Sequence, residues 1–243
     1  MRILLVSDLH YTLKQLDWVT SVAGEYDLVV LAGDHLDIAS IVEPDAQIAV
    51  ISEYLDRIAS KTTVVACSGN HDLNADNEHG ERAAMWFDAA RAAGVFVDGT
   101  SFGTEELLVT VCPWWDGPRT RDDVDRQLAS DAARVGSRRW IWVYHAPPDA
   151  SPTSWTGKRH YGDEDLVAWI TRYEPFIVMS GHVHQSPFAS DGAWSDRIGS
   201  TLVLNAGRQI GPVPARVELD TDSGVARWSS LAGIEEASFA GTR

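Results

Sequence analysis

Five short apolar segments, each four or five residues long, constrain the fold of this chain more than any other feature of its sequence. Continuous apolar runs of this length, bounded by turn residues, are typical of strands buried inside α/β proteins. Helical patterns over residues 42–60 and 81–93 separate the second, third and fourth runs. The alternation predicts an α/β fold. The runs are Ile3–Val6, Leu28–Ala32, Thr63–Cys67, Trp140–Tyr144 and Phe176–Met179.

The second half of the chain is richer in short β-like runs. They lie at residues 107–111, 201–204, 215–219 and 225–228, with further helical patterns near 121–135 and 163–172. The sequence contains no internal repeat and no linker-like stretch, so we expect one domain over residues 1–243. Small and charged residues dominate positions 232–243, and we expect a loose tail there.

Composition and charge exclude several classes of protein. Thirty-five acidic and twenty basic residues give a net charge of −15, whereas nucleic-acid binders neutralise phosphates with Lys and Arg. No segment approaches the length of a membrane span, and Asp8 interrupts the first apolar run too early for a signal peptide. Two cysteines are too few for a disulfide framework. We therefore expect a cytoplasmic protein without general nucleic-acid or membrane binding, and its oligomeric state stays open.

Residues of the kinds that bind metals follow all five apolar runs. In open α/β sheets such groups gather at the carboxyl ends of the strands, so five such ends would form a single polar site. Imidazole and carboxylate groups together suit first-row divalent ions. Seven candidates are too many for one tetrahedral ion, and they suit two ions with a carboxylate between them. The candidates are Asp8, His10, Asp34, Asn70, His145, His182 and His184.

The distribution of histidines supports a metal site over a purely structural role. A single Asp-x-His after a strand is common and carries little weight. Six of the eight histidines follow the five runs, however, and only His79 and His160 do not. Histidines that serve packing alone have no reason to follow strand after strand. We therefore expect two divalent ions drawn from Mn, Fe, Zn and Ni, with Mn or an Fe/Zn pair favoured.

In chain order the motifs read DxH, GDxxD, GNHD, H and GHxH, and this set resembles the calcineurin-like metallophosphoesterase superfamily. The resemblance spans Asp8 to His184. It implies a four-layer α/β/β/α sandwich with two facing mixed β-sheets and a metal site at the carboxyl ends of the strands. It also implies that Asp34 bridges two ions. The first ion would be held by Asp8, His10, Asp34 and His184, and the second by Asp34, Asn70, His145 and His182.

Departures from the motifs narrow the resemblance. The Ser/Thr protein phosphatases of this superfamily read GDxHG, GDxVDRG and GNHE. Here Ile38 follows Asp37, so the phosphate-binding arginine of the second motif is missing, and Asp72 follows His71. The resemblance therefore favours a bacterial-type member over the protein phosphatase branch. Residues 204–207 also resemble the turn that closes the site in many bacterial members, with Ala206 in place of proline.

These residues predict a dinuclear metal-dependent phosphoesterase. Two ions lower the pKa of a bridging water, and the resulting hydroxide attacks phosphorus in line. By resemblance, His71 is the general acid or a phosphate contact and Asp37 orients it, while His35 has no role. A phosphodiester is favoured, nucleotide-like esters included. A phosphomonoesterase of the same family, or a scaffold protein on the same fold, is the alternative.

Loops rich in aromatic and basic residues are candidates for contacts to a small phosphate-ester substrate. Aromatic rings stack on bases or sugars, and arginines bind phosphates. Ten tryptophans in one chain also place several in loops for packing reasons alone. The candidates from these loops and from the closing turn are Trp114, Trp115, Arg159, Asn205 and Arg208.

Overall fold

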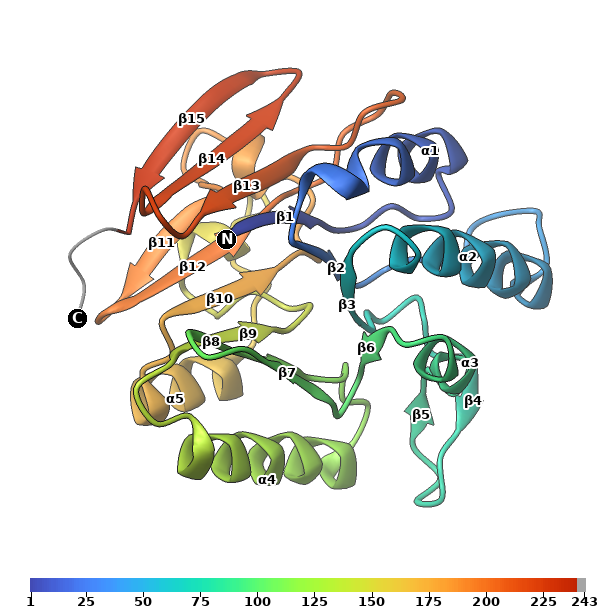
Figure 1. Ribbon diagram of the computed structural model, residues 1–243, viewed down its shortest axis with the longest axis horizontal. Helices are drawn as coiled ribbons and strands as arrows, with labels where there is room; N and C mark the ends of the chain where they lie inside the picture. Colours follow the sequence, from blue (N-terminus) through green and yellow to red (C-terminus); the bar gives the residue numbers. More distant parts are fainter. Residues whose placement is uncertain (240–243) are drawn as a thin grey trace.

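The computed structural model describes residues 1–239, and it consists of two mixed β-sheets that face each other between two layers of helices (Figure 1). This confirms the predicted four-layer sandwich. The first sheet has the order β15-β14-β13-β1-β2-β3-β6, and the second has the order β11-β12-β10-β9-β8-β7. A small hairpin of β4 (Ala75–Asp76) and β5 (Arg82–Ala83) lies outside both.

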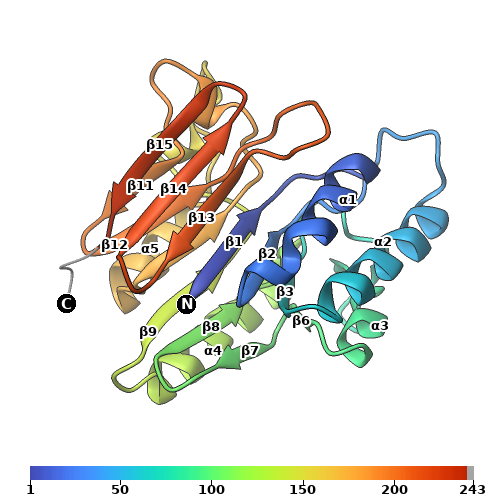
Figure 2. The ribbon, with the colours of Figure 1, turned by 45° about the horizontal axis from the view of Figure 1, so that its top comes forward.

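The first sheet combines parallel and antiparallel parts. Neighbours β1, β2, β3 and β6 are parallel, whereas β13, β14 and β15 continue the sheet beyond β1 in antiparallel fashion. Figure 2 shows these last strands extending past the helices. The strands are β1 (Arg2–Val6), β2 (Leu28–Ala32), β3 (Thr63–Cys67), β6 (Phe96–Val97), β13 (Arg216–Asp220), β14 (Val225–Ser230) and β15 (Gly233–Ser238).

The second sheet has a parallel centre of β12, β10, β9 and β8, with antiparallel strands at both edges. Its strands are β7 (Ser101–Gly103), β8 (Leu107–Val111), β9 (Arg139–Val143), β10 (Ile177–Ser180), β11 (Ser195–Ile198) and β12 (Thr201–Asn205). The five predicted apolar runs therefore become central strands, three in the first sheet and two in the second. The residues that follow their carboxyl ends come together at one end of the sandwich.

Side-chain alternation along the strands builds the layers. In β1, Ile3 and Leu5 face the core between the sheets, while Leu4 and Val6 face the helices. Helices α1 (Leu13–Val22), α2 (Pro44–Ala59) and α3 (Phe87–Ala92) cover the outer face of the first sheet, and α4 (Pro118–Arg134) and α5 (Glu164–Tyr173) cover that of the second. Short 3₁₀ turns complete the chain at Ala23–Glu25, Pro152–Ser154 and Ser186–Phe188.

Two sequence-based expectations are corrected by the fold. Residues 233–238 form β15 rather than a loose tail, and Phe239 is buried against Phe176; residues 240–243 lie outside the described part. The helix expected over 81–93 begins only at Phe87, because Arg82 and Ala83 pair with β4. Glu81 instead accepts the backbone N–H groups of Arg119 and Thr120 and so caps α4.

None of the helices in residues 1–239 combines the length and the apolar character that a membrane span requires.

Candidate metal centre

The seven predicted ligands follow five strands of both sheets and converge at one end of the sandwich. Asp8 and Asp34 come two residues after β1 and β2, and Asn70 comes three residues after β3. His145 follows β9, and the two histidines of the GHxH motif follow β10. The strand ends of two sheets therefore supply one site, which no single sheet could build.

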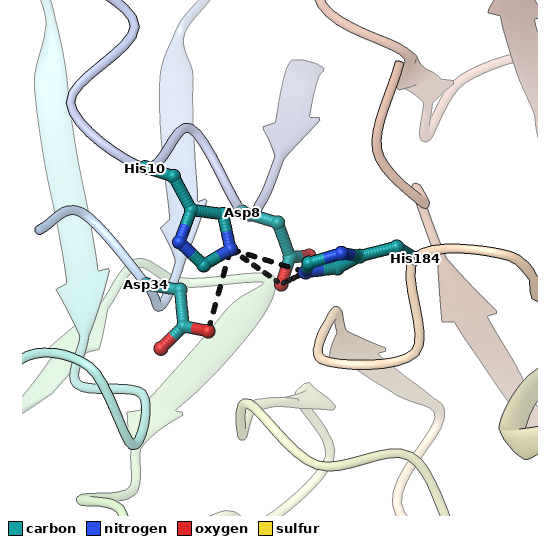
Figure 3. A group of neighbouring side chains, drawn as sticks. All are labelled: Asp8, His10, Asp34 and His184. Atoms are coloured by element: carbon teal, nitrogen blue, oxygen red, sulfur yellow. Dashed lines mark hydrogen bonds and ion pairs between the residues drawn. The ribbon is translucent and has the colours of Figure 1, made fainter. Parts of the chain in front are cut away.

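Four of these side chains form a first ligand cluster. Candidate ligand atoms of Asp8, His10, Asp34 and His184 all lie within 4.8 Å of one another. Figure 3 shows the four side chains pointing toward one another, with contacts converging on the His10 ring. The His10 Nε2 atom lies 3.1 Å from His184 Nε2 and 3.6 Å from Asp34 Oδ2. Two carboxylates and two imidazoles suit a first-row divalent ion.

A second ligand cluster adjoins the first and shares Asp34 with it. Atoms of Asp34, His145 and His182 also lie within 4.8 Å of one another, and His145 Nε2 is 3.3 Å from Asp34 Oδ2. The Asn70 Oδ1 atom and the His145 Nε2 atom are buried without a hydrogen bond. A buried polar atom without a partner is costly, and a cation would satisfy both atoms. The donor set therefore fits a second ion.

Hydrogen bonds around the shared residues select the atoms that stay free for ions. The Asp34 Oδ1 atom accepts the backbone N–H of His71 at 2.9 Å, which leaves Oδ2 between the two clusters. His145 donates its Nδ1–H to the carbonyl of Ala32 at 2.7 Å, so the lone pair on Nε2 points into the site. Ligand histidines are commonly fixed in this way by a bond from the second ring nitrogen.

The backbone at the site is unusually strained. Asp8, His10, Asp34 and His182 have φ angles between 42° and 65°, a region that residues other than glycine rarely occupy. Backbone bonds hold this geometry: the N–H groups of Asp8 and His10 donate to the carbonyls of Gly33 and Asp34 at 3.0 and 2.9 Å. Strain of this kind persists where surrounding structure fixes it, and it concentrates at functional sites.

Three positions beside the ligands require glycine, because a side chain there would have no space. A Cβ at Gly69 would lie 2.2 Å from Asp34 Oδ1 and 2.7 Å from His145 Nε2, and one at Gly33 would lie 2.3 Å from His145 Nδ1. At Gly181 it would meet Asp8 Oδ2 at 2.5 Å. These glycines let three turns approach the ligand side chains more closely than any larger residue would allow.

The electrostatics of four ligands favour the protonation states that metal binding needs. Burial raises the pKa of Asp34 and of Asp8, but neighbouring histidines outweigh it and hold both below the usual range. Burial lowers the pKa of His10 and of His182 to about 4, which leaves both rings neutral at pH 7. Ligand groups bind metals as carboxylates and neutral imidazoles.

His145 behaves differently from the other two imidazoles. Burial lowers its pKa, yet the nearby carboxylates of Asp34 and Asp8 outweigh this effect and raise the pKa to about 9. The two buried carboxylates thus attract positive charge to this position, and a divalent ion would supply that charge in place of a proton.

His71 lies at the opening of the site, while the expected contact to Asp37 is missing. The Nε2 atom of His71 is 3.9 Å from Asp34 Oδ2, and its Nδ1 accepts the N–H of Ile38 at 3.5 Å. Asp37 lies near His71, but its carboxylate accepts the N–H of Ala39 at 2.9 Å. Within residues 1–239 no hydrogen bond joins Asp37 to His71, so the orientation of His71 by Asp37 stays a prediction. The backbone N–H of Ile38 contacts His71 Nδ1 instead.

Asp72 is a residue whose importance the sequence reasoning missed. Its buried carboxylate accepts the N–H groups of His35, Leu36 and Gly69 at 2.8–3.0 Å, and His35 Nδ1 lies 3.0 Å away. These bonds tie the turn after β2 to the turn after β3, which carry Asp34 and Asn70. His35 is accordingly buried and packed, without a place among the ligands. The signal was visible, since Asp72 is the residue that departs from the GNHE motif.

The predicted substrate residues divide into three groups. Trp114 and Trp115 line a cavity of about 500 Å³ beside His182, and Arg159 lies over Tyr161 at the same side. Arg208 is exposed and lines a second cavity, of about 490 Å³, beside His184. Asn205 is fully buried, and its amide bonds Thr153, Val183, Ser186 and Gly207. The expectation that Asn205 contacts substrate is corrected, because all its polar atoms are occupied internally.

Comparisons with known proteins agree with this architecture. Residues 1–186 match the family model described as calcineurin-like phosphoesterase. A search of curated proteins found no match. A solved structure from Thermus thermophilus is 14% identical, with 98% of each chain covered and a TM-score of 0.61. A dimetal phosphatase from Danio rerio is 11% identical, with 99% of each chain covered and a TM-score of 0.57.

A purple acid phosphatase from yellow lupin seeds is also similar in structure. It is 14% identical, the alignment covers 100% of this chain and 52% of the lupin chain, and the TM-score is 0.53. At such identities these likenesses establish the fold.

Proposed function

The chain belongs to the calcineurin-like phosphoesterase family and is a metal-dependent phosphoric ester hydrolase; from this premise we propose that it hydrolyses small phosphodiesters with two divalent ions in its two ligand clusters. The observation that carries the proposal is the position of Asp34 Oδ2, 3.6 Å from His10 Nε2 in one cluster and 3.3 Å from His145 Nε2 in the other. When bound, such an ion pair lowers the pKa of a water and neutralises charge on the phosphate.

The protein residues would hold and orient the reacting groups. Asp8, His10 and His184 complete the first cluster around Asp34, and Asn70, His145 and His182 complete the second. Because His71 Nδ1 accepts from the Ile38 N–H, its proton resides on Nε2, the nitrogen nearer Asp34. His71 is thus placed to donate that proton to an oxygen of the bound ester.

Space and charge support a diester over a monoester. Cavities of about 500 and 490 Å³ adjoin His182 and His184, so both substituents of a diester have room. A monoester carries an extra negative charge that calls for further cations. Ile38 stands in the motif position where protein phosphatases have an arginine, and it is 70% exposed. Arg208 supplies a cation close enough to lower the pKa of His10.

The donor set also guides the choice of metal. Both clusters mix imidazole with oxygen ligands, and the thiols of Cys67 and Cys112 are buried with raised pKa values. Such mixed sites suit Mn or an Fe/Zn pair. We further propose a cytoplasmic protein with a small substrate and no nucleic-acid partner, as the net charge of −15 supports.

A comparison of two nitrophenyl esters after metal loading tests this function. Protein loaded separately with Mn, Fe, Zn or Ni should bind two ions per chain and hydrolyse bis-p-nitrophenyl phosphate faster than p-nitrophenyl phosphate. Faster monoester hydrolysis would support the alternative phosphomonoesterase. Failure to bind metal or to hydrolyse either ester would support a non-catalytic scaffold.

A further inference from the structure

The cavity beside His182, here called the aromatic cavity, differs in character from the rest of the site. Its walls carry the rings of Trp114, Trp115, Tyr144 and Tyr161. Four acidic residues also line it, and no Lys or Arg does so among residues 1–239, although the Arg159 guanidinium lies 5.5 Å from the centroid of the Tyr161 ring. Aromatic faces together with carboxylates, without basic residues, are the surroundings that attract organic cations.

The aromatic cavity is joined directly to the second ligand cluster. Tyr161 stacks on the ring of His182 with the centroids 5.1 Å apart and the planes inclined by 23°. Trp114 packs against His182 and His145 at centroid distances of 5.1 and 5.7 Å. A phosphate held at the clusters would therefore direct one of its ester substituents along these rings.

Most of the negative charge in the aromatic cavity is not neutralised by a cation. Asp165 pairs with Arg121 at 2.5 Å, but in the described residues no salt bridge involves Asp116, Asp163 or Glu164. Glu164 is exposed at the start of α5. Asp163 is compensated by hydrogen bonds, so Asp116 and Glu164 are the carboxylates that favour a positively charged occupant over a neutral one.

Asp163 also occupies the N-terminus of α5, the part of the cavity that would otherwise attract an anion. Its Oδ1 accepts the backbone N–H groups of Asp165 and Leu166 and so caps the N-terminus of α5. Its Oδ2 accepts from Trp115 Nε1 at 3.1 Å and from the Tyr144 hydroxyl. The helix end therefore presents a carboxylate, which repels a second phosphate group.

On the basis of the proposed phosphodiesterase function, we propose that the aromatic cavity binds an alkylammonium group, such as that of choline, on one ester substituent of the substrate. The rings supply the faces for a cation–π contact, and the carboxylates supply the charge. A nucleobase would also stack on these rings. It carries no positive charge, however, and leaves the carboxylates without a counter-charge.

Two esters of the same shape test the inference. We compare p-nitrophenyl phosphocholine with p-nitrophenyl 3,3-dimethylbutyl phosphate, in which carbon replaces the charged nitrogen. The choline ester should have the higher kcat/KM by roughly tenfold, the scale of a desolvated cation–π contact. Tyr161→Leu and Glu164→Gln should reduce this ratio toward one. Glu105→Gln, which changes an exposed residue in the loop between β7 and β8, is the matched control and should keep it.

The outcomes separate this inference from the function on which it rests. Equal rates for the two esters, with bis-p-nitrophenyl phosphate hydrolysed, would overturn the ammonium site and leave the phosphodiesterase in place. A clear preference for a thymidine p-nitrophenyl phosphate would also overturn it in favour of a nucleobase.

A binding measurement covers the case in which no ester is hydrolysed, which would refute the proposed function. Tryptophan fluorescence should then change saturably with choline chloride in the wild type and in Glu105→Gln, and neither with sodium chloride nor in Tyr161→Leu. An unsaturable or salt-like response would overturn the ammonium site.

Discussion

The two ligand clusters share Asp34, but their remaining side chains are held in different ways. In the second cluster His145 is fully buried, bonded through Nδ1 to the Ala32 carbonyl, and enclosed by Gly33 and Gly69. In the first cluster the His184 side chain is 29% exposed and borders an open cavity. His145 is therefore fixed before an ion binds, whereas His184 is an imidazole at the surface; the other histidine of the second cluster, His182, also borders a cavity. We expect the second ion to be held more tightly.

The largest effect should come from the residue on which both clusters depend. Asp34→Asn removes the charge that the two ions share, so we expect the loss of at least one ion per chain and of all measurable activity. Metal analysis and hydrolysis of bis-p-nitrophenyl phosphate check this together. Two retained ions with near-normal turnover would show that Asp34 does not bridge.

Replacing His71 should impair chemistry while sparing both clusters. General acid catalysis contributes about 10²–10⁴-fold, and it matters most for poor leaving groups. His71→Ala should therefore lose far more activity on alkyl phosphates than on nitrophenyl esters, with the metal content unchanged. Equal losses on both ester types would instead assign His71 to phosphate binding. Loss of metal would place it among the ligands.

At Gly69 the backbone approaches the Asp34 and His145 side chains closely, and one added methyl group would disrupt this contact. Gly69→Ala would push against Asp34 and His145 at once, and a displacement of about 1 Å can cost roughly 10²-fold in rate. The second ion should be lost before the first. Gly24→Ala is the control, because a Cβ at Gly24 meets no atom within 4 Å. Normal activity in Gly69→Ala would mean that the turn after β3 shifts to accommodate the methyl group without displacing the ligands.

The difference between the clusters can be measured with one histidine from each. Removing a ligand or its support typically costs about 10–100-fold in metal affinity. We expect His145→Ala to weaken the tighter of two binding steps and His184→Ala to weaken the looser one, as read by calorimetric titration with Mn²⁺. The same step affected in both variants would contradict the distinction.

The smallest effect concerns pH and a carboxyl group behind the second cluster. Asp98 accepts the Ser68 N–H at 2.8 Å, and burial raises its pKa to about 6. Because the folded state holds this proton more tightly than the unfolded state, the stabilisation is complete below about pH 4 and is lost as the pH rises through 6. Asp98→Asn should therefore gain about 6–12 °C in Tm relative to wild type between pH 4 and 7.5, the size that a pKa raised to about 6 implies. Chelator present in both samples removes metal effects, and a pH-independent difference would refute the linkage.

The sequence predicted the parts of the molecule that depend on local pattern. Apolar runs identified β2, β3 and β8 with their observed bounds, since buried parallel strands are continuous in apolar residues. The sequence also identified the residues of both clusters, because candidate ligands follow the ends of the strands. It missed α1, where buried apolar side chains are few, and β15, whose residues are mostly exposed at a sheet edge.

Long-range contacts account for the errors at the site itself. Asn205 has the residue type of a substrate contact, but its four internal partners come from two distant segments and its own turn. At Asp37 the competing partner is local, because its carboxylate accepts the N–H of Ala39 although His71 lies nearby. Asp72 acts by joining two turns that only the fold brings together. Local sequence carries no information on which of several nearby polar groups a side chain selects.

The most direct test of the two-cluster account is a crystal structure of Mn-loaded protein with anomalous scattering recorded for the metal. The account predicts two peaks about 3.5–4 Å apart. Asp34 should ligate both, with His10 and His184 beside one peak and His145 and His182 beside the other. A single peak, or a pair that does not share Asp34, would contradict it.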